Sequence, residues 1–398
     1  MLSNGPQEPV QPDIDYYPSI DKYRSRTEQR LRDGGLDTVL REGLPQFIDS
    51  PASWTASIID EADSWLYYLS PEDIEEIKEA TRRFQALGLP LSELAPETFP
   101  LPYLKTRIRA WSRGLHYGLG FVVVRGFPVD NLTAEERVIV FAGLSSYVGN
   151  VRARQDQGGA VLSHVTDMTR VHADAIGNPA FTAGSQAMHT DPGEIIAMFC
   201  VDTAAEGGES RIASSTALYN QLASQRPDLI NTLSEDWILD GFGGVPKFTK
   251  RPILFVTPDN QVIVQFVRRA LTGFREVPRS SDIPPITEAQ AEALDALHFK
   301  ALEQCISIRF EPGDFQFLNN LNILHSRTSF RDGDNHKRHL LRMWLRDEEY
   351  GWLLPKQLTE TAHWKRLFEL ERAEQSFPLE PQVKSEKFDQ PVRNESHC

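Results

Sequence analysis

The amino-acid sequence predicts a mainly β protein with flanking helices, whose core is a double-stranded β-helix of the jelly-roll, cupin-like kind. Beyond about residue 161, short apolar runs recur between Gly, Pro and Asp turns, a pattern typical of strands. Upstream of about residue 117, apolar residues instead recur at helical spacing. A helical part that leads into a strand-rich half favours a jelly roll decorated with helices.

Four elements are expected before the strand-rich half begins. Residues 70–87 have an acidic first turn and apolar residues at helical spacing, so they predict a helix. Thr133 and Glu136 have the spacing of a capping box, which predicts a second helix over 133–147. The other two elements are a helix over 101–117 and a buried strand over 120–130.

The strand-rich half contains apolar runs that predict strands and longer segments that predict helices. The strand runs are 194–204, 251–259, 260–267, 306–318 and 339–347, and the helices are 215–225 and 288–302. No repeat of fixed period is visible in the sequence.

We therefore expect a single domain over residues 21–375. Its helical part extends to about 117, and its jelly-roll core spans about 118–350. The segments 1–20 and 376–398 are rich in proline and polar residues, so we expect a flexible arm and a flexible tail. Apolar patterning over 350–372 fits either a helix that joins copies of the chain in a homo-oligomer or a terminal helix docked on the core.

Composition and charge exclude several classes of partner. The 398-residue chain has a net charge of −14, which argues against nucleic acid, because proteins that bind it present basic stripes. No apolar run approaches the roughly 18 residues of a membrane span, and the N-terminus lacks a secretory signal. Three widely spaced cysteines do not indicate a disulfide framework. We expect a cytoplasmic protein with a small-molecule substrate.

Two histidines and one aspartate form a candidate metal site. His189 and Asp191 precede a strong strand and lie two residues apart, so on an extended segment they point to the same face. His325 lies near the end of a later strand, which an antiparallel barrel can bring beside the earlier one. Two imidazoles and one carboxylate leave three open positions on an octahedral metal, as in the facial triad of non-haem Fe(II) oxygenases.

A second triplet of the same type, His172 and Asp174, competes with this pair. It is followed by a loop rather than by a strand, so we interpret His172 as a polar loop residue. The remaining histidines have no carboxylate at a better ligand spacing. His336 and His339 flank a basic strand and are expected to make ordinary hydrogen bonds.

Two arginines predict an anion-binding site on that basic strand. Arg338 and Arg342 are four residues apart, so they share a face with Leu340 and Trp344. Buried guanidiniums need anionic partners, and the planar fork of arginine fits a carboxylate. The alternative is a pair of surface arginines bonded to nearby acidic residues, namely Asp332, Asp334 or Glu348.

A glycine pair precedes a hydroxyl that suits the same anion. The glycines of EGGESRIASS permit a tight entry into a strand, and Ser210 offers a donor to the carboxylate that the arginines attract. Taken alone, GGES is only a turn before a strand.

Four motifs, taken in order, resemble those of the taurine dioxygenase-like (clavaminate synthase-like) Fe(II)/2-oxoglutarate-dependent oxygenases. They are HTD, GGES, GDFQFLNNLNILHSR and RHLLRMWLRD. The run GFVVVRGFP is similar to the early strand of that family. The resemblance covers roughly residues 105–350. It implies a double-stranded β-helix in which His189, Asp191 and His325 bind iron, with Fe(II), 2-oxoglutarate and O₂ as cofactor and co-substrates.

The resemblance also implies roles for the anion-binding residues. Arg338 would bind the distal carboxylate of 2-oxoglutarate with Ser210, which stands where the family commonly has the threonine of GGDT. Arg342 would reach the proximal carboxylate or an anionic substrate. The implied reaction oxidises an unactivated C–H bond and releases succinate and CO₂. Hydroxylation, desaturation and ring closure all remain open, because the outcome depends on the pose of the substrate.

The expected substrate is a small carboxylate-bearing molecule such as an aliphatic amino acid, because Arg342 is cationic and its neighbours Met343 and Leu345 are apolar.

Two other functions use the same residues. A zinc-dependent hydrolase would need a general base, which none of the motifs supplies. A non-catalytic cupin-like binding protein would not need an intact triad and both arginines.

Overall fold

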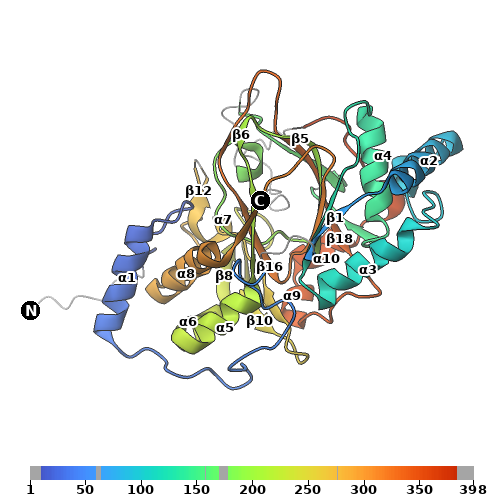
Figure 1. Cartoon of the computed structure of the whole chain (residues 1–398). Helices are drawn as coiled ribbons and strands as arrows, with labels where there is room; N and C mark the ends of the chain where they lie inside the picture. The colour runs from blue at the N-terminus through green and yellow to red at the C-terminus, as the bar shows by residue number, and fades with distance from the viewer. Residues whose placement is uncertain (1–9, 60–63, 157, 170–177, 276, 383–398) are drawn as a thin grey trace, which may run out of the picture.

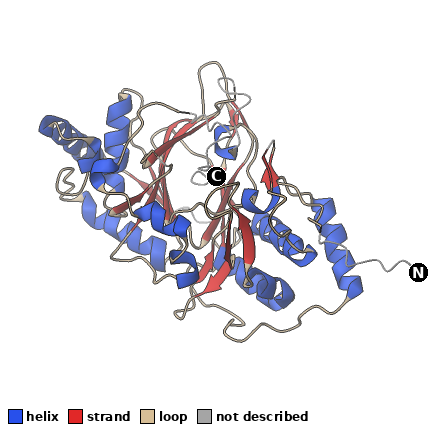
Figure 2. Ribbon diagram, turned by 180° about the vertical axis from the view of Figure 1, so that it is seen from behind, coloured by secondary structure: helices blue, strands red, loops and turns tan. Residues whose placement is uncertain are grey.

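The computed structural model describes residues 10–59, 64–156, 158–169, 178–275 and 277–382. Two β-sheets stand at the centre of the molecule, and helices flank them on both sides (Figures 1 and 2). None of the helices in these residue ranges has the length and apolar character needed to cross a membrane.

The larger sheet has seven strands in the order β1-β2-β15-β5-β18-β3, and β4 also pairs with β18. All pairs are antiparallel except β1 with β2. The strands span Leu66–Tyr68 (β1), Phe121–Arg125 (β2), Val151–Ala153 (β3), Leu162–Thr166 (β4), Ile195–Asp202 (β5), Phe315–Asn319 (β15) and His339–Arg346 (β18). The strands predicted over 120–130, 194–204 and 339–347 are thus confirmed.

The smaller sheet is antiparallel, with the order β14-β7-β16. Its strands span Ile306–Ile308 (β14), Ser210–Ser214 (β7) and Ile323–Arg327 (β16). The predicted run 306–318 therefore contributes one strand to each sheet. Four two-stranded pairs join Glu206–Gly207 (β6) to Phe330–Arg331 (β17), Trp237–Asp240 (β8) to Phe248–Arg251 (β9), Leu254–Val256 (β10) to Val262–Val264 (β11), and Gly273–Phe274 (β12) to Val277–Pro278 (β13).

The longer helices form two groups, with α2, α3 and α4 on one side of the sheets and α1, α5, α6 and α8 on the other (Figure 1). The first group spans Pro71–Leu87 (α2), Leu104–Tyr117 (α3) and Ala134–Ser145 (α4), and the second spans Ile20–Asp33 (α1), Ser215–Gln225 (α5), Pro227–Leu233 (α6) and Glu288–Gln304 (α8). Shorter helices span Arg269–Thr272 (α7), Lys356–Thr359 (α9) and Ala362–Phe368 (α10), with 3₁₀ turns at Leu91–Glu93, Pro179–Phe181 and Arg372–Glu374.

Local capping explains where the predicted helices begin. Thr133 accepts a hydrogen bond from the backbone N–H of Glu136, whose side chain accepts one in return, so the predicted capping box is confirmed. Ser70 caps α2 in the same way. Helix α1 was not predicted. None of its residues is fully buried, although Tyr23 stacks on Phe299 of α8 with ring centroids 5.3 Å apart.

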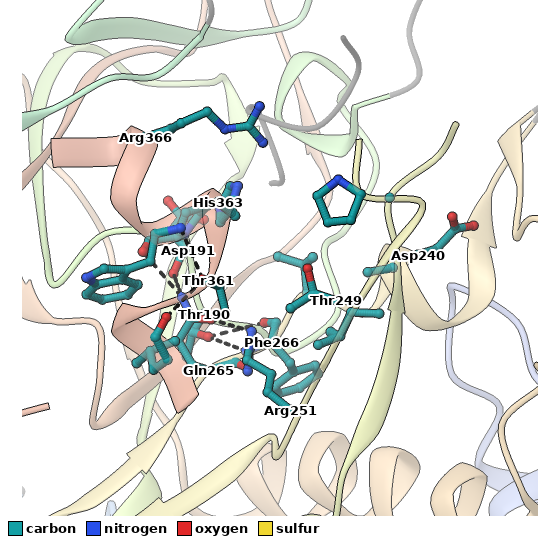
Figure 3. A pocket seen from close by; sticks show the side chains of 18 residues that line it. Thr190, Asp191, Asp240, Thr249, Arg251, Gln265, Phe266, Thr361, His363 and Arg366 are labelled. Atoms are coloured by element: carbon teal, nitrogen blue, oxygen red, sulfur yellow. Dashed lines mark hydrogen bonds between the residues drawn. The ribbon is translucent and has the colours of Figure 1, made fainter. Parts of the chain in front are cut away.

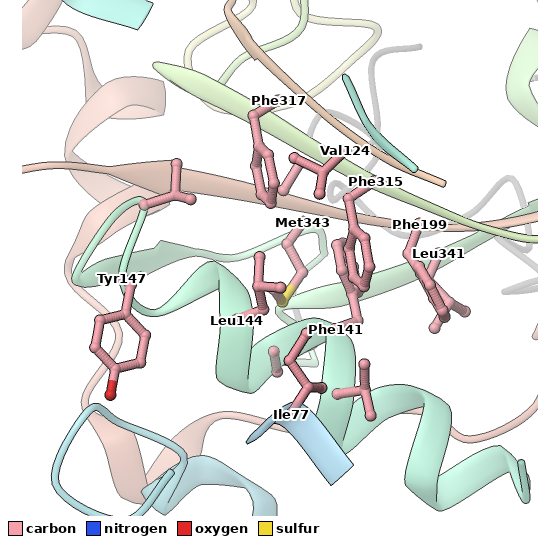
Figure 4. Packing of buried hydrophobic residues seen from close by; sticks show 14 of the residues in the cluster. Ile77, Val124, Phe141, Leu144, Tyr147, Phe199, Phe315, Phe317, Leu341 and Met343 are labelled. Carbon is pink, nitrogen blue, oxygen red and sulfur yellow. The ribbon is translucent and has the colours of Figure 1, made fainter. Parts of the chain in front are cut away.

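Helices α2 and α4 cover one face of the larger sheet. Phe141 of α4 stacks on Phe199 of β5, which stacks in turn on Phe315 of β15, with ring centroids 5.9 and 4.5 Å apart (Figure 4). Ile77 and Met343 lie in the same buried cluster. Each large apolar side chain buried in this way contributes about 1.5–3 kcal/mol. This packing fixes the positions of β5, β15 and β18. The opposite face of these strands is turned toward the space between the two sheets.

The ends of the chain are described only in part. Residues 1–9 of the predicted arm and 383–398 of the predicted tail lie outside the described residues. Within 350–372, the side chains of Leu358, Trp364 and Leu367 are buried in a cluster that also contains Trp344 of β18. This segment therefore packs on the core of its own chain, as one of the two sequence-based alternatives expected.

Candidate metal centre

A pair of backbone hydrogen bonds brings the two site histidines together. The N–H of His189 donates to the carbonyl of His325, and the N–H of His325 donates to the carbonyl of His189, both at 3.0 Å. Residues directly opposite each other across antiparallel chains have neighbouring side chains on one face. The two imidazole centroids accordingly lie 4.3 Å apart. The predicted approach of the late strand to the earlier histidine is confirmed.

Asp191 completes a group of three potential metal ligands. Its Oδ1 lies 3.7 Å from Nε2 of His189 and 3.8 Å from Nε2 of His325. One ligand atom from each residue lies within 4.8 Å of the other two, and all three side chains are buried. The spacing in the HTD triplet therefore places the histidine and the aspartate toward one centre, as alternation along an extended segment predicted.

The second oxygen of Asp191 is held by two donors on β18. Oδ2 accepts a hydrogen bond from Nη1 of Arg342 at 3.0 Å and another from Nε1 of Trp344 at 2.7 Å. The backbone N–H of Asp191 is also fixed, because it donates to Oδ1 of Asn320 at 2.7 Å. These contacts leave Oδ1 as the oxygen that faces the two imidazoles.

The protonation of the histidines fits a divalent iron. Nδ1 of His189 lies 2.7 Å from the carbonyl oxygen of Ala187 and must donate to it, so the lone pair is on Nε2, which faces Asp191. Burial lowers the pKa of His189, and it lowers the pKa of His325 to about 3. Both rings are therefore neutral at neutral pH. Neutral imidazoles and an ionised carboxylate form a donor set that suits Fe(II).

A cavity of about 440 Å³ lies beside the two histidines. Arg338 lines it, is buried, and has Nη1 without a hydrogen-bond partner among the described residues. Burial lowers the pKa of Arg338 to about 10. Asp332 contacts only the backbone N–H of Arg338, at 2.9 Å. Because Arg338 and Arg342 are both buried, the alternative of a surface pair bonded to nearby acidic residues is wrong.

The GGES turn makes room for Arg338. Gly208 has a φ of +81°, and a Cβ built on it would lie 3.0 Å from Cδ and Nε of Arg338. Ser210 follows at the start of β7, lines the same cavity and donates to Oε1 of Gln316 at 3.2 Å. The interpretation of GGES as a tight entry into a strand is confirmed, and the structure adds its contact with the arginine.

Alternation along β18 divides its side chains between the site and the core. Arg342 and Trp344 share the interior face, as their spacing predicted. Met343 and Leu345 point the other way, into the cluster that also contains Phe141 (Figure 4 shows Met343). The apolar character of Met343 and Leu345 therefore does not support an aliphatic substrate, because consecutive strand residues face opposite sides of a sheet.

A second cavity of about 730 Å³, partly open to solvent, also adjoins the HTD triplet (Figure 3). Nε2 of Gln265 donates to the carbonyl of Asp191 at 2.9 Å, and Nη2 of Arg251 donates to Oε1 of Gln265 at 2.7 Å. Burial lowers the pKa of Arg251 to about 10, and no carboxylate of the described residues lies within ion-pair distance of it. This cavity therefore places a buried cationic side chain near the aspartate of the triad.

Sequence reasoning missed three polar residues of this region. Gln155 accepts a hydrogen bond from Nη2 of Arg342 at 3.0 Å, and Gln316 accepts one from Ser210. Gln155 lies outside the quoted motifs, and Gln316 lies within GDFQFLNNLNILHSR, where no role was assigned to it. Arg327 lines the cavity beside the histidines, and its position two residues after His325 was the available signal. The competing pair His172 and Asp174 lies outside the described residues.

Solved structures share this fold. Asparagine oxygenase, solved with Fe(II), a 3-hydroxyasparagine and succinate, aligns with a TM-score of 0.55 and 17% identity over 71% of this chain and 93% of its own. The non-heme iron oxygenase OrfP, solved with Fe, succinate and (3S)-hydroxy-L-Arg, aligns with a TM-score of 0.54 and 15% identity over 71% and 94%. The fold is thus one found in non-haem iron oxygenases.

Sequence comparison identifies the family. Residues 68–344 match the family described as "Taurine catabolism dioxygenase TauD, TfdA family". The chain is 34% identical over 360 residues to the taurine hydroxylase-like protein SAT17 of Stachybotrys chartarum, which covers 88% of this chain and 93% of that protein. It is 25% identical over 331 residues to FR-33289 synthase of Streptomyces rubellomurinus, covering 81% and 96%. The chain belongs to the TauD/TfdA family and is an iron- and 2-oxoglutarate-dependent dioxygenase, which confirms the resemblance seen in its motifs.

Proposed function

We propose that this dioxygenase oxidises an unactivated C–H bond of a small, carboxylate-bearing amino acid, with His189, Asp191 and His325 as the ligands of Fe(II). The observation that carries the proposal is the convergence of two neutral imidazoles and one carboxylate oxygen beside a cavity lined by a buried arginine. In this proposal the two central sheets form a jelly-roll core. His325 is on the smaller sheet, and the residues that orient Asp191 are on the larger one.

Arg338 and Ser210 are proposed to hold the distal carboxylate of 2-oxoglutarate. A buried guanidinium without an anionic partner costs several kcal/mol, so the cavity favours a ligand that brings a carboxylate to it. The fork of arginine can bind both carboxylate oxygens, and a neighbouring hydroxyl can donate a further hydrogen bond. Ser210 and Arg338 line the same cavity as the two histidines, which supports this division of roles.

Arg342 is proposed to serve the metal centre from the opposite side of Asp191. Its bond to Oδ2 orients the carboxylate, and its positive charge remains at the cavity wall, where the proximal carboxylate of the co-substrate would lie. When bound, iron and 2-oxoglutarate supply the O₂-dependent oxidation of the C–H bond, with release of succinate and CO₂. The chain itself contributes ligands, their orientation and a site shielded from water.

An amino-acid substrate is supported by two observations. Both solved relatives described above contain a hydroxylated amino acid beside iron and succinate. The second cavity of this chain carries Arg251, a buried cation that suits a substrate carboxylate (Figure 3). We therefore propose that the primary substrate enters by this second cavity, while 2-oxoglutarate occupies the cavity of Arg338.

The site gives less support to a zinc-dependent hydrolase. Such an enzyme needs a general base near its metal-bound water. None of the described residues that line the cavity beside the histidines is an aspartate or a glutamate.

Spectroscopy under anaerobic conditions tests the proposed ligands. Protein loaded with Fe(II) and 2-oxoglutarate should show a weak visible charge-transfer band, and Asp191→Ala and His325→Ala should abolish it. His336→Ala is the matched control, because His336 is exposed and lies on the loop before Arg338. A band that persists in both triad variants would remove the basis of the proposal.

A substrate screen then tests the proposed chemical class. Candidate amino acids, sulfonates and neutral compounds are compared by succinate release, with Arg251→Met assayed beside the wild type. We expect turnover with carboxylate-bearing amino acids and a raised KM in the variant. Turnover of bulky neutral compounds alone would contradict the proposed substrate but not the proposed iron ligands.

A further inference from the structure

Arg327 faces the cavity beside the metal centre, although neither the motifs nor the proposed reaction assigns it a role. It lies two residues after His325 on β16, so both side chains project from the same face of the strand. Its partner across the sheet is Ser210 of β7, and directly opposed residues of an antiparallel pair also share a face. Arg327, Ser210 and His325 all line the cavity, as this register requires.

The guanidinium of Arg327 is buried, and its bonds are incomplete. Only 4% of the residue is exposed. Nη2 donates to the carbonyl oxygens of Thr182 and Gly184, whereas Nε and Nη1 have no hydrogen-bond partner among the described residues. No carboxylate of those residues lies within 4.0 Å of it. Contacts with the backbone thus account for the hydrogen bonds of Nη2, whereas the other two nitrogens have no partner among the described residues.

A second buried cation lies close to Arg327. The Cζ atoms of Arg327 and Arg338 lie 4.8 and 5.4 Å from the centre of the Phe330 ring. Both arginines also line the cavity beside the two histidines. Two like charges in a buried site repel each other, so an anion bound near both would relieve an unfavourable arrangement.

We propose that Arg327 is a second cationic anchor for the distal carboxylate of the 2-oxo acid, and that Arg327 and Arg338 together select dicarboxylic over monocarboxylic 2-oxo acids. The inference rests on the proposed function, in which Arg338 and Ser210 hold that carboxylate. A carboxylate offers about four lone-pair positions, enough to accept bonds from Ser210 and from both arginines. The position of Arg327 directly opposite Ser210 supports a shared ligand.

Binding of two 2-oxo acids separates this role from a structural one. The dissociation constants of 2-oxoglutarate and 2-oxovalerate, which has the same carbon chain without the distal carboxylate, are measured on anaerobic Fe(II)-loaded protein and by calorimetry on protein loaded with Zn²⁺. We expect Arg327→Met to weaken 2-oxoglutarate binding by about tenfold or more, because charge-assisted hydrogen bonds are lost. Binding of 2-oxovalerate should change by less than about twofold, because it has no group for Arg327. Arg327→Lys should restore part of the preference.

Arg152→Met is the matched control. Arg152 is also buried, and its guanidinium donates to the carbonyls of Ser92 and Leu94 and to the side chain of Gln375. It does not line the cavity beside the histidines. Its replacement should lower the melting temperature as Arg327→Met does, without changing the preference between the two 2-oxo acids.

Several outcomes would overturn the inference. If Arg327→Met binds both 2-oxo acids as the wild type does, or binds both more weakly by the same factor, Arg327 has a structural role only. If Arg327→Met does not fold, the ratio of the two dissociation constants in Arg327→Lys and Arg327→Gln decides, and an unchanged ratio rejects the proposal. A wild-type protein that binds no 2-oxoglutarate would instead refute the proposed function itself.

Discussion

The indole nitrogen of Trp344 lies 2.7 Å from Oδ2 of Asp191 and donates a hydrogen bond to it. Arg342 binds the same oxygen, so two donors from one strand fix the plane of the carboxylate. The other oxygen is thereby presented to His189 and His325. Partners that orient a metal ligand in this way typically change metal affinity by about 10–100-fold when they are removed.

Trp344→Phe is therefore expected to weaken Fe(II) binding by about tenfold. The variant removes the hydrogen bond to Asp191 and keeps most of the buried aromatic volume. Titration of the apoprotein with Fe(II) under anaerobic conditions measures the change. Trp237→Phe is the control, because Trp237 is equally buried but donates to the backbone carbonyl of Thr232, at 2.9 Å. Equal Fe(II) affinity in the two variants would show that the indole bond does not position Asp191.

The two H-x-D triplets can be separated by metal content. His189→Ala removes an imidazole that lies 3.7 Å from Asp191, so it should abolish stoichiometric Fe(II) binding. His172→Ala, in the competing triplet, should retain it. The iron content is measured after anaerobic loading and desalting. The ligand assignment fails if His172→Ala loses the metal and His189→Ala keeps it.

Gly208 is expected to control access to Arg338. Gly208→Ala places a methyl group 3.0 Å from Cδ and Nε of that arginine and also strains a backbone with φ of +81°. Gly88→Ala is a matched control for strain, because its φ is +61° and no atom lies within 4 Å of the added Cβ. Both variants should lose about 1 kcal/mol of stability.

Only Gly208→Ala should also raise the dissociation constant of 2-oxoglutarate. Urea unfolding and co-substrate titration measure the two quantities separately. An unchanged dissociation constant in Gly208→Ala would mean that the GGES turn does not seat the arginine for ligand binding.

The free energy of unfolding should fall below pH 6.5, in part because of His298. Burial lowers the pKa of His298 to about 3, and its Nδ1 accepts a hydrogen bond from the N–H of Met188 at 3.0 Å. The unfolded chain binds a proton below pH 6.5 while the folded chain does not, so stability is complete above that pH and decreases as the pH falls toward 3. From pH 7 to pH 5.5 the loss from this one group is about 1 kcal/mol.

His298→Gln is expected to flatten this pH dependence. The glutamine keeps an acceptor for Met188 and does not titrate, so urea unfolding at pH 7 and pH 5.5 should give a smaller difference than in the wild type. Parallel pH profiles for the two proteins would show that His298 is protonated in the folded state.

Sequence patterns predicted the structure correctly where the pattern and the feature that it predicts lie within one short segment. Alternation in 339–347 placed Arg342 and Trp344 on one face, and capping residues located the start of α4. The use of Met343 as support for an aliphatic substrate disregarded this alternation, because Met343 faces the helices. Helix α1 was missed because its contacts with α8 are between residues far apart in the sequence, for example the ion pair of Arg26 with Asp295 and the stacking of Tyr23 on Phe299.

The sequence by itself determined the residue types of the candidate metal site and placed His189 with Asp191, and Arg342 with Trp344, on a common face, because each pair lies two residues apart. Only the tertiary structure decided that Arg342 and Trp344 bind Asp191, and that Arg327 stands opposite Ser210. Those partners are separated by more than 110 residues along the chain. Their approach depends on the register between strands, which the packing of the whole core sets and no local pattern encodes.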